Sequence, residues 1–263
     1  MKIQIDSPKL AYHKERVDEW IKTGNCVPIY VEIGLTNMCN HNCIFCGLDW
    51  ARGRNKLETK TLLENLKDMG EFGVKSVCFS GAGEPLLHKD FPLFIKKAKE
   101  SGMDAAFSTN AVLYNEKIAR ETLPYTTWTR FSIDAASAET HSKIHKTSKR
   151  DFQKILRNIS KAAEIKKENN YNVSLGAQFL LLEENASEVI EFVKMCKNLG
   201  VNIAQIKPYS KNPHSMKQFV INYDNFKEFE EKLKQFSSDE FLVQYRSTRA
   251  ERLSKEREYN ICY

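Results

Sequence analysis

Three closely spaced cysteines are the residues of this sequence that most directly indicate chemistry. Cys39, Cys43 and Cys46 lie in the segment TNMCNHNCIFCGLDW, with gaps of three and two residues between them. This spacing does not suit a series of disulfides, and His41 is the one nearby residue that could add a fourth ligand. Three thiolates can hold three irons of a 4Fe-4S cluster or three positions of a tetrahedral zinc ion. A site with three protein ligands leaves one metal position open for an exogenous molecule.

The other four cysteines, Cys26, Cys78, Cys196 and Cys262, are scattered along the chain. We expect Cys78 and Cys196, which lie in apolar segments, to be small side chains of the core. Seven cysteines in a chain without a secretion signal favour reduced thiols and metal or redox chemistry over structural disulfides.

Composition indicates a folded globular protein. The chain has 263 residues, of which 41% are hydrophobic and 28% are charged, and this apolar content can form a sizeable core. The sequence has no run of about 18 apolar residues and no apolar signal segment at its start, so we expect a cytoplasmic protein without a membrane span. The net charge of +6 is spread along the chain, and no basic stripe with interleaved aromatic residues favours nucleic-acid binding.

Apolar periodicity predicts alternating strands and helices. The expected helices cover residues 9–23, 59–70, 90–102, 115–121, 151–169, 185–199 and 222–236, with a helical tail from Ser247. The expected strands cover residues 28–36, 75–81, 103–109, 127–134, 172–181 and 201–208, with one more at 240–246.

About six strand–helix units in sequence predict an α/β fold with parallel strands, as an open doubly wound sheet or as a barrel. Both architectures bind ligands at the carboxyl ends of their strands. The cysteine loop follows the first strand, and the segments GAGEP, STN and SIDAAS follow the next three. The polar motifs therefore fall where this rule places a ligand site.

The motifs together resemble those of the radical S-adenosylmethionine (radical SAM) superfamily. CNHNCIFC has the family's CxxxCxxC spacing, with the aromatic Phe45 before the third cysteine. FSGAGEPLLHKDF resembles the family's GGEP segment, with Ala82 in place of the second glycine. FSTNA and RFSIDAASAETHSKIH resemble its third and fourth strand segments. The resemblance covers roughly residues 28–210.

The resemblance implies a partial (β/α)6 TIM-like barrel over residues 25–240, preceded by a helical extension over 1–24. Residues 241–263 would form a strand and helix tail. Family members often continue into a cysteine-rich extension of the SPASM or twitch type, and Cys262 resembles the first ligand of such a domain. Either Cys262 is the start of a truncated domain of this type, or it is an unpaired thiol. We expect a single cluster in this chain.

The resemblance also implies an oxygen-sensitive enzyme with one 4Fe-4S cluster and S-adenosylmethionine as cofactors. In that family, an electron from the cluster cleaves S-adenosylmethionine to methionine and a 5′-deoxyadenosyl radical, which abstracts hydrogen from a substrate. The implied partners are a flavodoxin- or ferredoxin-type electron donor and a small-molecule or peptide substrate, with a peptide or carbohydrate intermediate favoured.

Site residues follow from the same resemblance, with Cys39, Cys43 and Cys46 as iron ligands. Glu84 would lie near the methionine ammonium, or would be a buried residue that orients its turn. Gln178 would line the ligand face, or would be a core amide. The remaining cofactor contacts are expected at Phe45, Gly81, Ala82, Gly83, Ser108, Asn110, Ser132 and Asp134.

Two other functions are compatible with the cysteines. The first is an iron–sulfur electron-transfer or sensor protein that does not cleave S-adenosylmethionine. The second is a zinc-binding nucleic-acid module with Cys39, His41, Cys43 and Cys46 as ligands, which leaves the later motifs unexplained. We expect His41, His88, His141 and His145 to be surface or capping residues.

Overall fold

A single parallel sheet organises the chain. The computed structural model describes residues 9–247. Its seven strands pair in sequence order, each parallel to the one before. They are β1 (Tyr30–Ile33), β2 (Ser76–Phe79), β3 (Asp104–Thr109), β4 (Trp128–Ser132), β5 (Ser174–Leu181), β6 (Ile203–Pro208) and β7 (Leu242–Tyr245).

This strand order decides between the two architectures that the sequence left open. In a doubly wound sheet, the strand order returns to the middle of the sheet and then continues toward the opposite edge. In this sheet, each new strand pairs with the strand that precedes it in the sequence. Within the described residues β1 and β7 remain edge strands, so the barrel is partial. The predicted α/β fold with parallel strands is confirmed, and the strand expected at 240–246 joins the same sheet as β7.

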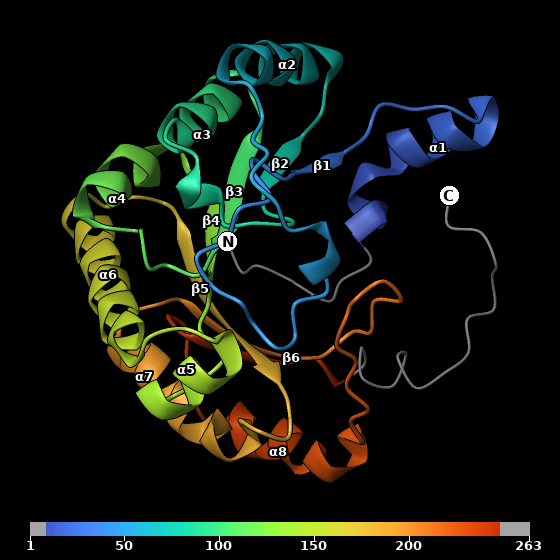
Figure 1. Cartoon of the computed structure of the whole chain (residues 1–263). Coiled ribbons are helices and arrows are strands. Elements are labelled where there is room, and N and C mark those ends of the chain that lie inside the picture. The colour runs from blue at the N-terminus through green and yellow to red at the C-terminus, as the bar shows by residue number, and fades with distance from the viewer. Residues whose placement is uncertain (1–8, 248–263) are drawn as a thin grey trace.

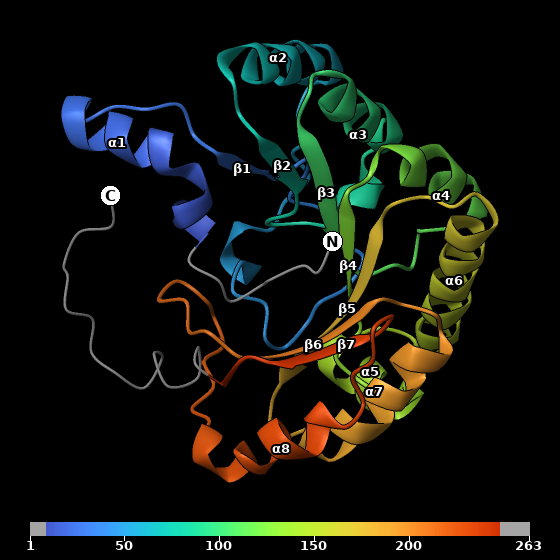
Figure 2. The same ribbon diagram turned by 180° about the vertical axis from the view of Figure 1, so that it is seen from behind.

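Helices cover the outside of the curved sheet (Figures 1 and 2). The α-helices are α1 (Lys14–Thr23), α2 (Thr59–Phe72), α3 (Phe91–Glu100), α4 (Glu116–Thr122), α5 (Ala138–His145), α6 (Lys149–Glu168), α7 (Val189–Asn198) and α8 (Glu228–Lys234). Short 3-10 helices are η1 (Lys9–His13), η2 (Asp49–Ala51), η3 (Pro85–Leu87), η4 (Leu123–Tyr125), η5 (Ala186–Glu188) and η6 (Tyr223–Phe226). No helix in the described part of the chain is long and apolar enough to cross a membrane.

The core lies between the sheet and these helices. Phe107 of β3 packs against Phe91 of α3, with 5.0 Å between ring centroids, and Phe131 of β4 packs against Tyr114. Because side chains alternate along a strand, the residues between these positions point to the opposite face of the sheet. We call this opposite face the inner face.

Three elements differ from the predicted ones. Helix α5 was not predicted as a separate helix. The helix expected at 222–236 is divided into η6 and α8, and the one expected at 185–199 starts as an α-helix only at Val189. In α1, which ends as predicted before Gly24, Trp20 and Ile21 stay 45% and 73% exposed. The helical tail expected from Ser247 and the residue Cys262 lie outside the described residues.

Candidate functional site

The three cysteines lie on the long loop between β1 and α2, shown in blue in Figure 1. Cys39, Cys43 and Cys46 are half-buried free thiols. The loop is fixed to the end of α5, because the N–H groups of Asn42 and Ile44 donate to carbonyl oxygens there at 3.0 and 2.8 Å. The thiols are therefore held at the carboxyl end of the sheet, where the sequence predicted them.

The spacing of the possible ligand atoms tests which metal group fits. In residues 9–247 one set of three has ligand atoms that all lie within 4.8 Å of one another, namely His41, Cys43 and His145. The three cysteine sulfurs do not form such a set, and neither do the four residues of the predicted zinc site. Three free thiols spaced too widely for a single ion fit a larger cluster that binds one thiolate at each of three irons.

The four histidines were expected to be surface or capping residues, and the surface alternative is wrong because all four are buried. The capping alternative fits His88, which ends η3 and whose Nδ1 accepts from the Asp90 N–H at 3.3 Å. His41, His88, His141 and His145 are each at most 2% exposed. The rings of His141 and His145 stack at 4.3 Å between centroids, and His41 meets both edge-on. The error has a clear origin: a four-residue spacing puts His141 and His145 on one face of α5, the helix that was not predicted.

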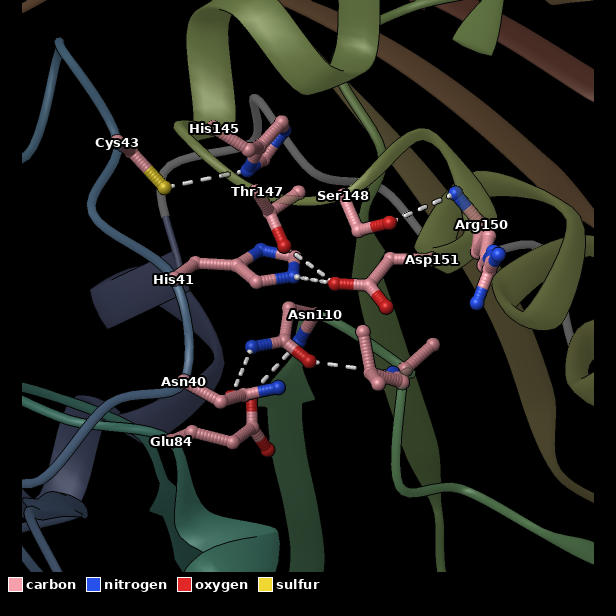
Figure 3. Close-up of polar contacts among 12 residues, drawn as sticks. Asn40, His41, Cys43, Glu84, Asn110, His145, Thr147, Ser148, Arg150 and Asp151 are labelled. Carbon is pink, nitrogen blue, oxygen red and sulfur yellow. Dashed lines mark hydrogen bonds and ion pairs between the residues drawn. The ribbon is translucent and has the colours of Figure 1, made fainter.

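His145 links the cysteine loop to the residues that follow β4, and Figure 3 shows its contact with Cys43. Its Nδ1 lies 3.1 Å from Cys43 Sγ, and its Nε2 lies 3.0 Å from the carbonyl oxygen of Ile133 and 3.4 Å from Asp134 Oδ2. Burial lowers the pKa of His145, but its electrostatic interactions and hydrogen bonds with Cys43 and Asp134 outweigh the burial and raise the pKa to about 10. A protonated imidazole can donate from both ring nitrogens, so His145 supports negative charge on the Cys43 sulfur.

Asp134, a predicted ribose contact, is fully buried behind this pair. Its Oδ1 accepts from the Leu180 N–H at 2.6 Å, and its backbone has a φ of 58°. The structure thus places the Asp134 carboxylate between β5 and α5.

The GAGEP segment packs directly on the cysteine loop. A Cβ added to Gly83 would lie 2.2 Å from the carbonyl oxygen of Met38 and 2.4 Å from that of Thr36, so no larger residue fits without displacing the loop. The Glu84 N–H donates to the same Met38 carbonyl at 2.8 Å. Gly81 has a φ of 124°, which side chains rarely adopt, and it lies exposed beside the half-buried Ala82.

The Glu84 carboxylate is buried and hydrogen-bonded to other groups of the protein. It is 3% exposed and accepts from the Thr109 hydroxyl at 2.7 Å, the Asn110 N–H at 2.8 Å and the Leu86 N–H at 3.1 Å. Burial raises its pKa to about 7, although these hydrogen bonds lower it. The contacts match the predicted alternative in which Glu84 orients its own turn.

The end of β3 supplies a further link to the cysteine loop. The Asn110 side chain donates to Asn40 Oδ1 at 2.7 Å and accepts from the Val112 N–H at 3.1 Å (Figure 3). The loop after β1, the GAGEP turn and the end of β3 therefore form one hydrogen-bonded unit around the thiols.

Polar atoms without protein partners lie on the inner face beside this unit. Ser108 Oγ and Gln178 Oε1 are buried and make no hydrogen bond. Gln178 is the register partner of Ser132 on the neighbouring strand, as expected of residues that line one ligand. Buried polar atoms are normally hydrogen-bonded, so these positions are suited to contact a bound molecule.

Phe45 belongs to the cysteine loop and is half-buried. It packs against a small apolar cluster of Leu180, Leu182 and Tyr209, and its ring centroid lies 5.3 Å from that of His145. The predicted contact between Phe45 and adenine is not tested by this packing.

Sequence reasoning missed Arg130 and His145. Arg130 precedes Ser132 by two residues in β4, so strand alternation places the two side chains on the same face. The role of His145 was less evident from the sequence, because its contact with Cys43 joins residues that are 102 positions apart.

Comparison with known proteins defines the class to which this fold and site belong. The family model that describes the sequences of the radical SAM superfamily matches residues 33–202, which is more than half of the chain. The chain therefore belongs to the radical SAM superfamily. This membership confirms the predicted superfamily and the predicted cofactors, a 4Fe-4S cluster and S-adenosylmethionine.

Among particular proteins, the chain is similar to a probable GTP 3′,8-cyclase of Saccharolobus islandicus, with 28% identity over 212 residues that cover 79% of this chain and 65% of the relative. It is 27% identical to a GTP 3′,8-cyclase of Listeria welshimeri over 68% of this chain and 53% of the relative. The chain thus spans between half and two thirds of the length of these relatives.

A solved structure has the same fold. The S-adenosylmethionine-bound structure of SuiB from Streptococcus suis matches with a TM-score of 0.70 and 18% identity, over 93% of this chain and 57% of that protein.

Proposed function

We propose that this chain is a catalytic radical SAM enzyme that cleaves S-adenosylmethionine reductively and abstracts hydrogen from a substrate. The observation that carries the proposal is the position of three free thiols, on a loop that Gly83 holds against the GAGEP turn. When bound, the cluster supplies the electron and the open iron site, and the protein supplies position and shielding from water.

In this proposal Cys39, Cys43 and Cys46 hold the cluster. The backbone of Gly81 and Ala82 and the side chains of Ser108, Ser132 and Gln178 contact S-adenosylmethionine. The unpartnered oxygen atoms of Ser108 and Gln178 support this assignment.

Four of the predicted cofactor contacts instead hold neighbouring groups in place. These residues are Asn110, Glu84, Asp134 and Phe45. Asn110 holds the cysteine loop, and Glu84 fixes the turn that the methionine moiety would contact. Asp134 orients His145 against Cys43, and Phe45 packs against the same histidine.

The substrate class is a small molecule or a peptide, and a flavodoxin- or ferredoxin-type protein is the electron donor. Because the similar proteins are named as GTP 3′,8-cyclases, a purine nucleotide is a further candidate substrate to test. The predicted peptide or carbohydrate intermediate remains the second class to test.

Spectroscopy on anaerobically reconstituted protein tests the cofactor assignment. We expect about four irons per chain, and a paramagnetic signal of the reduced cluster that shifts when S-adenosylmethionine is added. Cys43→Ala should lose the cluster, whereas Cys26→Ala, which changes a half-buried cysteine outside the loop, should keep it. An unchanged signal on addition of S-adenosylmethionine would contradict the proposal.

A further inference from the structure

The inner face of the sheet carries polar residues in two rows that follow the strand register. One row contains Ser108 of β3, Arg130 of β4 and Gly176 of β5. The next row, nearer the carboxyl ends, contains Ser132, Gln178, Gln205 and Gln244 on β4 to β7. The site proposed for S-adenosylmethionine uses only part of these rows.

Arg130 is the charged residue at the centre of the first row. Its guanidinium makes no ion pair or hydrogen bond with any residue from 9 to 247, and its Nε is buried. On one side Ser108 has a buried, unpartnered hydroxyl, and on the other Gly176 has no side chain. Arg130 as a whole is half-buried, and a guanidinium that is partly removed from water normally has an anionic partner, because unmet donors are costly away from water.

The charges around Arg130 favour an anionic ligand. The carboxylate of Glu32 on β1 accepts from the hydroxyls of Ser80 and Tyr30, and it lies more than 4.0 Å from the Arg130 guanidinium. Among the residues that the structure describes, no carboxylate therefore lies within ion-pair distance of Arg130.

The glutamine row offers recognition of uncharged polar groups. Gln205 donates to Gln244 Oε1 at 3.1 Å, and both lie in register beside Gln178. Carboxamides present donors and acceptors together, so such a row can bind hydroxyl, amide or heterocyclic groups.

From this arrangement we infer that the inner face binds a small anionic substrate, whose phosphate or carboxylate group pairs with Arg130 and whose polar body contacts Gln205 and Gln244. The inference deepens the proposed function and rests on it for the reaction, but not for the binding. Arg130 lies one row farther from the strand ends than Ser132 and Gln178, so the anion lies deeper in the barrel than the groups of the cofactor that contact those two residues.

Calorimetric titration of the anaerobic, cluster-loaded protein tests this site. The probes are inorganic phosphate, GTP and malonate, which separate a phosphate from a carboxylate as the preferred group. At least one probe should bind the wild-type protein, and Arg130→Gln should weaken that binding by about tenfold or more, as expected for a hydrogen bond to a charged group.

Two further variants make the result specific. Arg130→Lys keeps the charge but loses the planar two-donor geometry, so its affinity should lie between those of the wild type and Arg130→Gln. Arg157→Gln changes an exposed arginine of α6 and should bind like the wild type. Iron analysis and thermal melting of each variant show whether it is folded.

The inference is overturned if none of the three probes binds the wild-type protein, or if Arg130→Gln binds them as the wild type does. Failure of the proposed function looks different. Absence of S-adenosylmethionine cleavage, together with Arg130-dependent anion binding, would reject the reaction and leave the binding site standing.

Discussion

At the scale of single residues, Glu84 shows how the site is built from buried polar contacts. Its carboxylate accepts three hydrogen bonds from two different segments, and it is almost completely removed from water. The GAGEP motif could be recognised from the sequence, and the turn-orienting role of Glu84 was one of two predicted alternatives. Its partners could not be predicted, because Thr109 and Asn110 are 25 and 26 residues away.

Burial of Glu84 predicts a specific pH dependence of stability. The pKa of Glu84 is raised from 4.5 to about 7, so between these values the folded protein keeps a proton that the unfolded chain releases. The stabilising contribution is complete below pH 4.5 and is lost as the pH rises through 7, a change of about 3 kcal/mol. Glu84→Gln removes the titration, so its stability relative to the wild type should rise over this range.

Urea unfolding of both proteins from pH 5 to pH 8 measures this difference. Glu191→Gln, at an exposed position of α7, is the control and should follow the wild type. Parallel stability curves for Glu84→Gln and the wild type would show that the Glu84 carboxyl does not titrate in this window.

At the scale of elements, the site depends on contact between two loops from neighbouring strands. Most of the strands and helices were predictable, because each carries its own apolar periodicity. Helix α5 was missed because its buried histidines do not register as an apolar stripe, although three of its eight residues are buried: His141, Ile144 and His145. The contacts between α5 and the cysteine loop were consequently missed as well.

The close approach of these loops predicts the effect of one added methyl group. Gly83→Ala should push Thr36 and Met38 away, shift Cys39 with them and destabilise the protein by about 1–3 kcal/mol. Gly34→Ala is the matched control, because its Cβ would lie 3.5 Å from the nearest atom, which is an ordinary contact. We expect most of the cluster iron to be lost in Gly83→Ala and retained in Gly34→Ala.

Iron content and thermal melting of the reconstituted variants measure this effect. Equal iron content in the two alanine variants would mean that the cysteine loop does not depend on its contact with the GAGEP turn.

At the scale of the whole molecule, the parallel sheet brings the carboxyl ends of its strands to one edge, and the motifs of four successive loops meet there. Periodicity predicted this convergence without distinguishing a barrel from a doubly wound sheet, since it says nothing of which strands are neighbours, and the barrel was implied by the family resemblance alone. Strand order settles that question. The same order aligns Arg130 with the glutamine row on the inner face, an arrangement that no local pattern shows.

The central claim is that the three thiols hold a cluster that cleaves S-adenosylmethionine. Its most direct test is to reduce the anaerobically reconstituted protein with dithionite, add S-adenosylmethionine and quantify 5′-deoxyadenosine and methionine. We expect both products from the wild-type protein and neither from Cys43→Ala. A wild-type protein with an intact 4Fe-4S cluster that forms no 5′-deoxyadenosine would contradict the claim, and would favour an electron-transfer or sensor role.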